Sequence, residues 1–216
     1  MTAMIGVDEA GRGCVLGPLV VAAVRATPEG IEMLKRLSIK DSKQYNTHKE
    51  RMLAFLSFED CRGIEIRHST ITAFIVDSHV RSPISNLNKL EQTAAFSCIK
   101  SLLRTDDEEI VLDSKQMFTV TADKVLARED FTGSCIAVDK ADRDYLVVAA
   151  ASVVAKTLRD KAAMEIMGDA FNKGAGYPNE HTEKWLRERI ARLGQWNGLK
   201  DVCKSWKWLA NIGINT

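Results

Sequence analysis

The sequence predicts an α/β domain built on a mixed β-sheet. Two apolar runs, over residues 4–8 and 16–24, are separated by a glycine-containing turn, which is typical of an early pair of strands. Helical and strand patterns then alternate along the chain, as in α/β proteins. The 216 residues, 45% of them hydrophobic, are enough for one or two domains with a substantial core.

The next elements follow from the spacing of apolar side chains. This spacing predicts helices over residues 31–37 and 48–56. Residues 63–68 alternate in polarity, which is typical of a strand at the exposed edge of a sheet. The first third of the chain therefore alternates between strand and helix.

The second half of the chain repeats this alternation. An amphipathic helix is predicted from apolar residues that recur at helical spacing, namely Leu87, Leu90, Ala94, Cys98 and Leu102. It leads into a strand over residues 109–113, and another strand should end near Asp139. A long helix packed on the sheet is expected between Val147 and Ile166, and short helices are expected after the turn at 174–178.

The bulk properties exclude some classes of protein. No apolar run approaches the ~20 residues that cross a bilayer, and the first residues do not resemble a signal peptide, so we expect a soluble, cytoplasmic protein. Five scattered cysteines without a Cys-x-x-Cys pair are expected to be reduced core residues. The net charge of +1 gives no argument for a nucleic-acid partner.

The most informative stretch is Asp8-Glu9-Ala10-Gly11-Arg12-Gly13, which follows the first apolar run. Carboxylates gathered where strands end suit hard divalent cations such as magnesium, which prefer oxygen ligands. The glycines allow a tight turn or a close approach to a phosphate. The alternative is a capped turn with a surface ion pair.

This stretch resembles the signature of type 2 ribonuclease H, the ribonuclease HII family, and the later motifs resemble its archaeal and eukaryotic branch more than its bacterial one. Seven further motifs follow in the order found in that family. They are Lys40-Asp41-Ser42-Lys43, Asn86-Leu87-Asn88-Lys89-Leu90-Glu91, Val111-Leu112-Asp113-Ser114, Lys140-Ala141-Asp142, Ala149-Ala150-Ala151-Ser152-Val153-Val154-Ala155-Lys156, Gly176-Tyr177-Pro178 and Ser205-Trp206-Lys207. The resemblance therefore extends over nearly the whole chain.

The resemblance implies a ribonuclease H-like fold, in which helices flank a mixed five-stranded sheet. It also implies a helical carboxy-terminal segment that closes over the substrate. We therefore expect a catalytic domain over residues 1–173 and a helical substrate-binding segment over residues 174–216.

By the same resemblance, Asp8, Glu9, Asp113 and Asp142 are the catalytic carboxylates and the ligands of two Mg²⁺ or Mn²⁺ ions. Two such ions about 3.5–4 Å apart can activate water and stabilise the leaving oxygen of a phosphodiester. The implied activity is endonucleolytic hydrolysis of the RNA strand of RNA/DNA hybrids, and cleavage 5′ of ribonucleotides embedded in DNA. The products carry a 3′-hydroxyl and a 5′-phosphate.

Reasoning from the residues leaves three points open for these carboxylates. Asp113 could cap a following helix instead. Composition alone cannot choose Asp142 over Asp139 and Asp144, and only the Lys-Ala-Asp register selects it. Neighbours on a regular strand point to opposite faces, so Glu9 can join Asp8 only if the strand ends there.

Further residues are implied as substrate contacts. In the family, the loop matching Gly11, Arg12 and Gly13 contacts the ribonucleotide 2′-hydroxyl and adjoining phosphates, and the tyrosine matching Tyr177 stacks on the next sugar. Three more candidates for phosphate or sugar contacts are Lys43, Asn86 and Lys156. For these three a solvated lysine or a helix cap is the open alternative.

Other functions are weighed against this one. Another two-metal nuclease or polynucleotidyl transferase of the same fold is the main alternative, and a non-catalytic nucleic-acid-binding module is the second. The expected partners are RNA/DNA hybrids and duplex DNA containing ribonucleotides. We see no glutamine and paired-aromatic motif for a sliding clamp, and we expect a monomer with no membrane partner.

Overall fold

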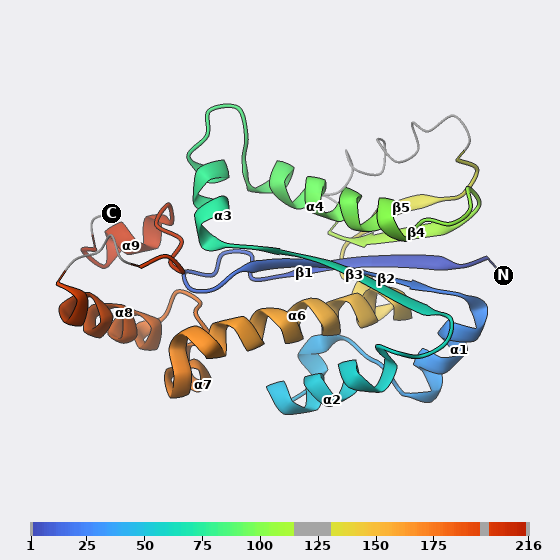
Figure 1. Ribbon diagram of the computed structural model, residues 1–216, viewed down its shortest axis with the longest axis horizontal. Helices are drawn as coiled ribbons and strands as arrows, with labels where there is room; N and C mark the ends of the chain where they lie inside the picture. The colour runs from blue at the N-terminus through green and yellow to red at the C-terminus, as the bar shows by residue number, and fades with distance from the viewer. Residues whose placement is uncertain (1, 115–130, 195–198, 215–216) are drawn as a thin grey trace. The chain divides into compact units, whose positions relative to one another are not determined.

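The computed structural model describes residues 2–114, 131–194 and 199–214 (Figure 1). The chain divides into two compact units, each assembled from separate stretches of sequence. The first unit takes its residues from Met1–Ala10, Val21–Ser69 and Glu91–Thr157. The second takes them from Gly11–Val20, Thr70–Leu90 and Leu158–Thr216.

A five-stranded sheet carries the fold. Its strands lie in the order β3-β2-β1-β4-β5. The bounds are β1 Met4–Ala10, β2 Leu19–Ala26, β3 Ile64–Ile71, β4 Glu109–Asp113 and β5 Cys135–Val138. The position of β3 at one end of this order confirms the predicted edge strand, and the sheet with its flanking helices confirms the predicted fold class.

Helices lie between β2 and β3, between β3 and β4, and after β5 in the chain (Figure 1). The α-helices described are α1 Pro28–Arg36, α2 His48–Phe58, α3 Ala73–Val80, α4 Leu87–Leu102, α6 Leu146–Met167, α7 Phe171–Gly174, α8 Glu180–Leu193 and α9 Lys207–Asn211. Single 3₁₀ turns are η1 Ser42–Gln44, η2 Ala141–Arg143 and η3 Gly168–Ala170.

Short polar side chains fix where several helices begin. The side chains of Thr27, Thr47 and Asn179 accept backbone N–H groups at the starts of α1, α2 and α8. Each satisfies a donor that has no partner inside the helix. The proline at the start of α1 adds to this signal because its fixed φ suits the first helical turn.

The parallel pairing of β1 with β4 places the ends of these strands together. The register runs from Met4 opposite Glu109 to Val7 opposite Leu112. The next residues along the two strands are Asp8 and Asp113. Two carboxylates thus reach the same edge of the sheet, because parallel strands present their carboxyl ends on one side.

Helix α6 packs closely on the sheet at Gly6 in β1. A Cβ atom at Gly6 would lie 2.3 Å from the carbonyl carbon of Val147 and 2.4 Å from the backbone nitrogen of Val148. Both contacts are with backbone atoms, so no side-chain rotation can relieve them. Glycine is therefore required here by the distance between strand and helix.

We expect Gly6→Ala to destabilise the protein by about 2 kcal/mol, since the added methyl group must push the strand and helix apart. Thermal denaturation followed by circular dichroism measures the effect. The control is Gly168→Ala, where a Cβ atom meets no atom within 4 Å and only the left-handed φ of +57° opposes the change. Equal melting temperatures for Gly6→Ala and wild type would contradict the packing argument.

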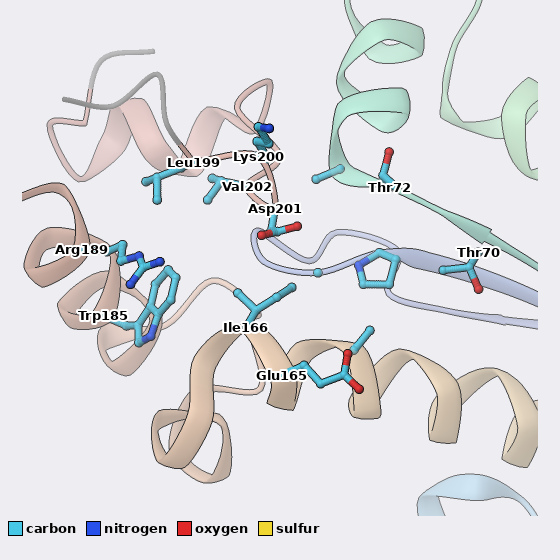
Figure 2. Close-up of a pocket in the computed structure, with 14 residues that line it drawn as sticks. Thr70, Thr72, Glu165, Ile166, Trp185, Arg189, Leu199, Lys200, Asp201 and Val202 are labelled. Atoms are coloured by element: carbon cyan, nitrogen blue, oxygen red, sulfur yellow. The ribbon is translucent and has the colours of Figure 1, made fainter. Parts of the chain in front are cut away.

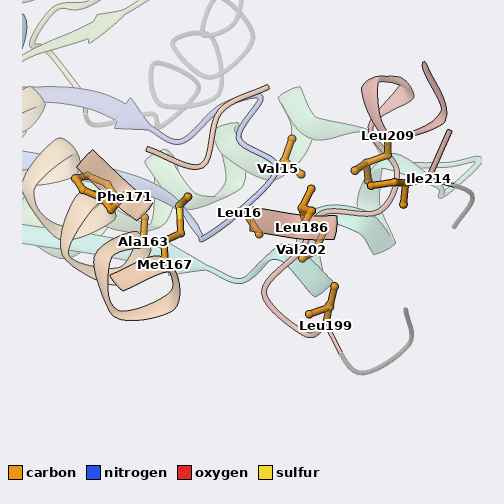
Figure 3. Close-up of a cluster of buried hydrophobic side chains, with 10 residues drawn as sticks. All are labelled: Val15, Leu16, Ala163, Met167, Phe171, Leu186, Leu199, Val202, Leu209 and Ile214. Atoms are coloured by element: carbon orange, nitrogen blue, oxygen red, sulfur yellow. The ribbon is translucent and has the colours of Figure 1, made fainter. Parts of the chain in front are cut away.

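The second unit has a hydrophobic core of its own (Figure 3). Its buried side chains come from the loop after β1, the end of α6, and the carboxy-terminal helices with the non-helical residues beside them. They are Val15, Leu16, Ala163, Met167, Phe171, Leu186, Leu199, Val202, Leu209 and Ile214. This core holds together segments that are distant in the sequence.

Several predicted bounds differ from the structure. Strand β1 continues through Glu9 to Ala10, so the expectation that it ends at Asp8 is wrong. Strand β2 begins at Leu19, later than expected, because Leu16 is buried in the core of the second unit instead. The division at residues 173 and 174 stays a prediction.

Two expectations concerned membranes and cysteines. None of the helices in the described part of the chain is both long enough and apolar enough to cross a membrane. All five cysteines are free thiols, and all but Cys61 are buried.

Candidate active site

Three carboxylates of the first unit converge at the edge of the sheet. Asp8 lies in the last three residues of β1, Asp113 is the last residue of β4, and Asp142 lies in the turn η2 after β5. Each offers one oxygen atom, and these atoms lie within 4.8 Å of one another. The structure therefore brings together three of the four carboxylates predicted to be catalytic.

Backbone hydrogen bonds orient two of these side chains. The N–H of Glu9 donates to Asp8 Oδ1 at 2.8 Å. The N–H groups of Ser114 and Ala141 both donate to Asp113 Oδ1 at 2.9 Å. Asp113 thus connects the end of β4 to the turn that carries the third carboxylate.

The chain around these residues adopts uncommon conformations. Ser114 has a φ of 71° and Lys140 a φ of 63°, both in the left-handed region that few non-glycine residues adopt. Such conformations persist where the surrounding structure holds them, and they concentrate at functional sites. Here they turn the chain sharply on either side of the cluster.

The cluster is electrostatically unfavourable without a cation. Asp8 is 6% exposed, and its pKa is well above the ordinary value, mainly through burial and then through repulsion by Glu9 and Asp113. Burial also raises the pKa of Asp142, which Lys43 opposes and Asp41 and Asp113 reinforce. A divalent cation would relieve this repulsion.

The donor set fits a hard divalent cation. Asp142 is 3% exposed, and among the residues the structure describes its buried Oδ1 atom has no hydrogen-bond partner. A buried carboxylate oxygen without a donor is costly and calls for a ligand. Three converging carboxylates, which no described histidine or cysteine joins, match the oxygen preference of Mg²⁺ and Mn²⁺.

The geometry distinguishes Asp142 from its neighbours. Asp142 is buried in the cluster, whereas Asp139 and Asp144 are exposed and do not belong to it. The Lys-Ala-Asp register therefore selects the side chain that meets the other carboxylates. Its catalytic role stays a prediction.

Glu9 holds a different position from the other three carboxylates. It lies within the strand and is partly buried, and the cluster does not include it. Its charge nevertheless raises the pKa of Asp8, so the two side chains interact electrostatically. Glu9 as a metal ligand stays a prediction.

Lys43 reaches the cluster from the turn η1. Its Nζ lies 3.4 Å from Asp142 Oδ2, while the side chain remains 76% exposed. Burial lowers the pKa of Lys43, but the charges of Asp142 and Asp41 outweigh this and raise it, so the amine stays protonated. At this position the ammonium group of Lys43 can contact both the carboxylate of Asp142 and a phosphate group.

Two serines support the cluster, and neither was singled out from the sequence. The hydroxyls of Ser42 and Ser152 lie 2.8 Å apart and are buried. A hydrogen bond from Ser152 also lowers the pKa of Asp8, against the larger effect of burial. Both serines stand within the quoted motifs, so their position in the sequence was a usable signal.

The predicted substrate loop lies in the second unit. Gly11 has a φ of +98°, and a Cβ atom there would lie 2.4 Å from the carbonyl oxygen of Pro18, so only glycine fits. Arg12 is exposed, and its Nη2 donates to Asn88 Oδ1 at 2.7 Å. Gly13 has open space around its Cα, since no atom lies within 4 Å of a Cβ placed there.

The other predicted substrate contacts occupy varied positions. Tyr177 is partly buried in the second unit, after the turn that follows α7. Asn86 accepts the N–H of Lys89 at 3.0 Å and so caps α4, as its alternative interpretation expected. Lys156 is partly buried on α6. Substrate contact by these three residues stays a prediction.

A cavity of about 500 Å³ also lies within the second unit (Figure 2). Trp185 and Arg189 of α8 line it together with Glu165 of α6 and Asp201. The carboxylate cluster contributes nothing to its described lining. Its mixed charges identify no ligand, so the candidate active site is the cluster and not this cavity.

Divalent cations are expected to stabilise the protein through the cluster. Between the ordinary aspartate pKa of 3.8 and the raised pKa of Asp8, the folded state binds more protons than the unfolded state. The free energy of unfolding therefore falls as pH rises through this window, and a cation should restore it at neutral pH. At a hundred times Kd this amounts to about 2.7 kcal/mol, or roughly 5–10 °C in Tm.

Scanning calorimetry at pH 7.5 with and without Mg²⁺ or Mn²⁺ measures this shift. Asp8→Asn should lose most of it, and in the absence of metal its Tm should equal or exceed that of wild type, because one source of repulsion is gone. A full metal-induced shift in folded Asp8→Asn would place the cation elsewhere.

Comparisons with known proteins agree with this architecture. A family model described as Ribonuclease HII matches residues 5–207. A ribonuclease HII from Methanococcus maripaludis is 33% identical over 193 residues, which cover 87% of this chain and 77% of that protein.

Solved structures resemble the whole chain. The crystal structure of ribonuclease H2 from Pyrococcus horikoshii OT3 is 28% identical, with a TM-score of 0.79 and coverage of 98% of this chain and 97% of that one. A ribonuclease HII from Archaeoglobus fulgidus, solved in a complex with PCNA, is 25% identical with a TM-score of 0.73 and coverage of 94% of each chain. With the family match over residues 5–207, these likenesses show that the chain belongs to the ribonuclease HII family of endonucleases.

Proposed function

We propose that the protein hydrolyses the RNA strand of RNA/DNA hybrids and cuts duplex DNA on the 5′ side of an embedded ribonucleotide, using two divalent cations. The products would carry a 3′-hydroxyl and a 5′-phosphate. The proposal depends on one observation: an oxygen atom of each of Asp8, Asp113 and Asp142 lies within 4.8 Å of the others. The chain belongs to a family of ribonucleases H, for which such a cluster fits metal-dependent hydrolysis.

The chain's residues have separate tasks in this reaction. The three aspartates would hold the cations together with Glu9, whose negative charge lies beside Asp8. When bound, two cations would activate the attacking water and neutralise charge on the leaving oxygen. Lys43 is placed beside Asp142, where it can contact a phosphate oxygen of the strand being cut. No protein nucleophile is needed.

Recognition of the ribonucleotide is assigned to the second unit. The 2′-hydroxyl is both donor and acceptor, and it distinguishes RNA from DNA at a single position. We assign its recognition to the backbone of Gly11 and Gly13, to Arg12 and to Tyr177, with Asn86 of the same unit as a further contact. Lys156 is a further proposed contact that belongs to the first unit. Because these groups would contact sugar and phosphate, cleavage should not depend on the base.

Cleavage assays with three duplexes test the proposal. One carries a single ribonucleotide in DNA, one is a continuous RNA/DNA hybrid and one is DNA throughout. We expect cleavage of the first two in Mg²⁺ or Mn²⁺, on the 5′ side of the single ribonucleotide, with 3′-hydroxyl products. Cleavage of all-DNA duplex at a similar rate would favour another nuclease of the same fold.

Tyr177→Ala is expected to slow cleavage at a single ribonucleotide by about 5- to 150-fold, because one stacking contact is worth roughly 1–3 kcal/mol. Duplex binding should weaken less, since the phosphate contacts remain. Kinetics and fluorescence anisotropy at one salt concentration separate the two effects. Equal loss of binding to plain and ribonucleotide-containing DNA, with cleavage of bound substrate unchanged, would make Tyr177 a packing residue.

We further propose that the protein acts as a cytoplasmic monomer in the removal of ribonucleotides from DNA, without help from a sliding clamp. Light scattering coupled to gel filtration tests the monomer. The clamp proposal is tested by adding a purified clamp to the cleavage assay, which should leave the rate unchanged.

A further inference from the structure

Arg159 is an unusual residue of the second unit. Its side chain is 0% exposed, although arginine is seldom fully buried unless it is paired. Its Nη1 lies 3.0 Å from Asp160 Oδ1, and Asp160 is itself buried. A buried pair of this kind is a poor source of stability, so its position needs another explanation.

The second nitrogen of the guanidinium joins two segments. Arg159 Nη2 donates to Cys14 Sγ at 2.8 Å and to the carbonyl oxygen of Leu16 at 3.4 Å. It also donates to the carbonyl oxygen of Ala175. Cys14 directly follows the Gly11-Arg12-Gly13 loop, and Ala175 stands two residues before Tyr177.

The guanidinium also contacts Tyr177 itself. Its central carbon lies 4.7 Å from the centre of the Tyr177 ring, which is a favourable cation–π distance. Burial raises the pKa of the Tyr177 phenol, so the ring stays neutral beside the arginine. The arginine therefore holds both the backbone before Tyr177 and the ring.

Backbone contacts bind the same two segments directly. The N–H groups of Val15 and Leu16 donate to the carbonyl oxygen of Gly176 at 2.8 and 3.1 Å. A Cβ atom at Gly176 would lie 2.7 Å from the carbonyl oxygen of Leu16. The turn can therefore lie this close to Leu16 only if residue 176 is glycine. These contacts fix the distance between residues 14–16 and the turn at Gly176. They do not determine the orientation of the Tyr177 ring, which Arg159 contacts.

We propose that Arg159 is a positioning residue that orients Tyr177 relative to the Gly11-Arg12-Gly13 loop and thereby sets the preference for a single ribonucleotide over a continuous hybrid. The inference rests on the proposed function of Tyr177. Lysine cannot replace arginine here, because a point charge on a flexible stem lacks the planar fork that donates to several acceptors while lying against a ring.

The test compares two substrates in each variant. The quantity measured is the ratio of kcat/KM for DNA with one ribonucleotide to kcat/KM for a continuous RNA/DNA hybrid. Arg159→Lys should lower this ratio roughly tenfold, since small displacements of positioning groups cost rate steeply. In the Tyr177→Ala background, Arg159→Lys should lower the ratio no further, because its effect acts through the ring.

A matched control and a milder variant guard against simple loss of folding. Arg25→Lys alters an arginine of the first unit that is paired with Glu65 and Glu108, and it should leave the ratio unchanged. Cys14→Ala removes an acceptor of Arg159 that also hydrogen-bonds Tyr177, and it should lower the ratio by a smaller factor. Cys14→Ala replaces Arg159→Lys as the test if Arg159→Lys does not fold.

The outcomes separate the inference from the proposed function. An unchanged ratio in folded Arg159→Lys, or in Cys14→Ala if Arg159→Lys is unfolded, would overturn the inference. Independent, multiplying effects of Arg159→Lys and Tyr177→Ala would overturn it as well. A wild type that cleaves neither substrate would instead overturn the proposed function.

Discussion

Replacing Asp8 with asparagine is expected to slow metal-dependent cleavage by more than about a hundredfold, because loss of a ligand shared by the cluster should cost at least ~3 kcal/mol of transition-state stabilisation. Asparagine keeps the shape of the side chain and can still accept the N–H of Glu9. Asp113→Asn should behave in the same way. Single-turnover cleavage of an RNA/DNA hybrid in Mg²⁺ measures both.

The control for these variants is a measurement of whether each one still folds. Asp8 is buried in a site with net negative charge, so its neutral replacement should leave the circular dichroism spectrum unchanged and the metal-free Tm no lower. Near-normal turnover by either folded variant would show that the catalytic centre lies elsewhere.

The second large effect is expected at Asp142, where three carboxylates close in sequence can be compared. Asp142→Asn should be nearly inactive, because this buried side chain offers an oxygen to the cluster. Asp139→Asn and Asp144→Asn should keep most activity, since both side chains are exposed and lie outside the cluster. Initial rates at saturating metal measure all three.

These three variants carry the same chemical change, so Asp139 and Asp144 are matched controls for Asp142. A reversed ranking would mean that the geometry of the cluster does not describe the active enzyme. At limiting metal concentration the activity of wild type should also fall as pH is lowered, because protonation of Asp8 and Asp142, whose pKa values are raised in the metal-free cluster, competes with cation binding.

Much of the fold was predictable because many helices and strands bury one face against the core, and the spacing of their apolar residues shows it in the sequence. The strand over residues 109–113 and the helix that begins at Leu87 have the predicted positions, since their apolar spacing is set by the core. Helix α3 was missed. Its Ala-Phe-Ile-Val start is a short apolar run that fits a strand as well as a helix, and only Thr72, which accepts the N–H of Ile75, marks a helix beginning there.

The candidate site was predictable where strands end and less so elsewhere. Asp8 and Asp113 follow apolar runs, and parallel pairing then brings them together. Asp142 lies in a 3₁₀ turn with no periodicity of its own, so only the motif register identified it. The contacts of Arg159 lie far apart in sequence, and no local pattern predicts them.

The parallel pairing of β1 with β4 also affects how the protein is made. Asp8 leaves the ribosome before the partner strand, which begins about 100 residues later at Glu109, and the turn that carries Asp142 comes later still. Strand pairings between residues far apart in sequence form slowly, because closing the long loop between them costs conformational entropy before the contacts are made. A nascent or truncated chain that stops before Ala141 therefore contains β1 without the complete carboxylate cluster, and we expect nuclease activity only from chains that extend past Asp142.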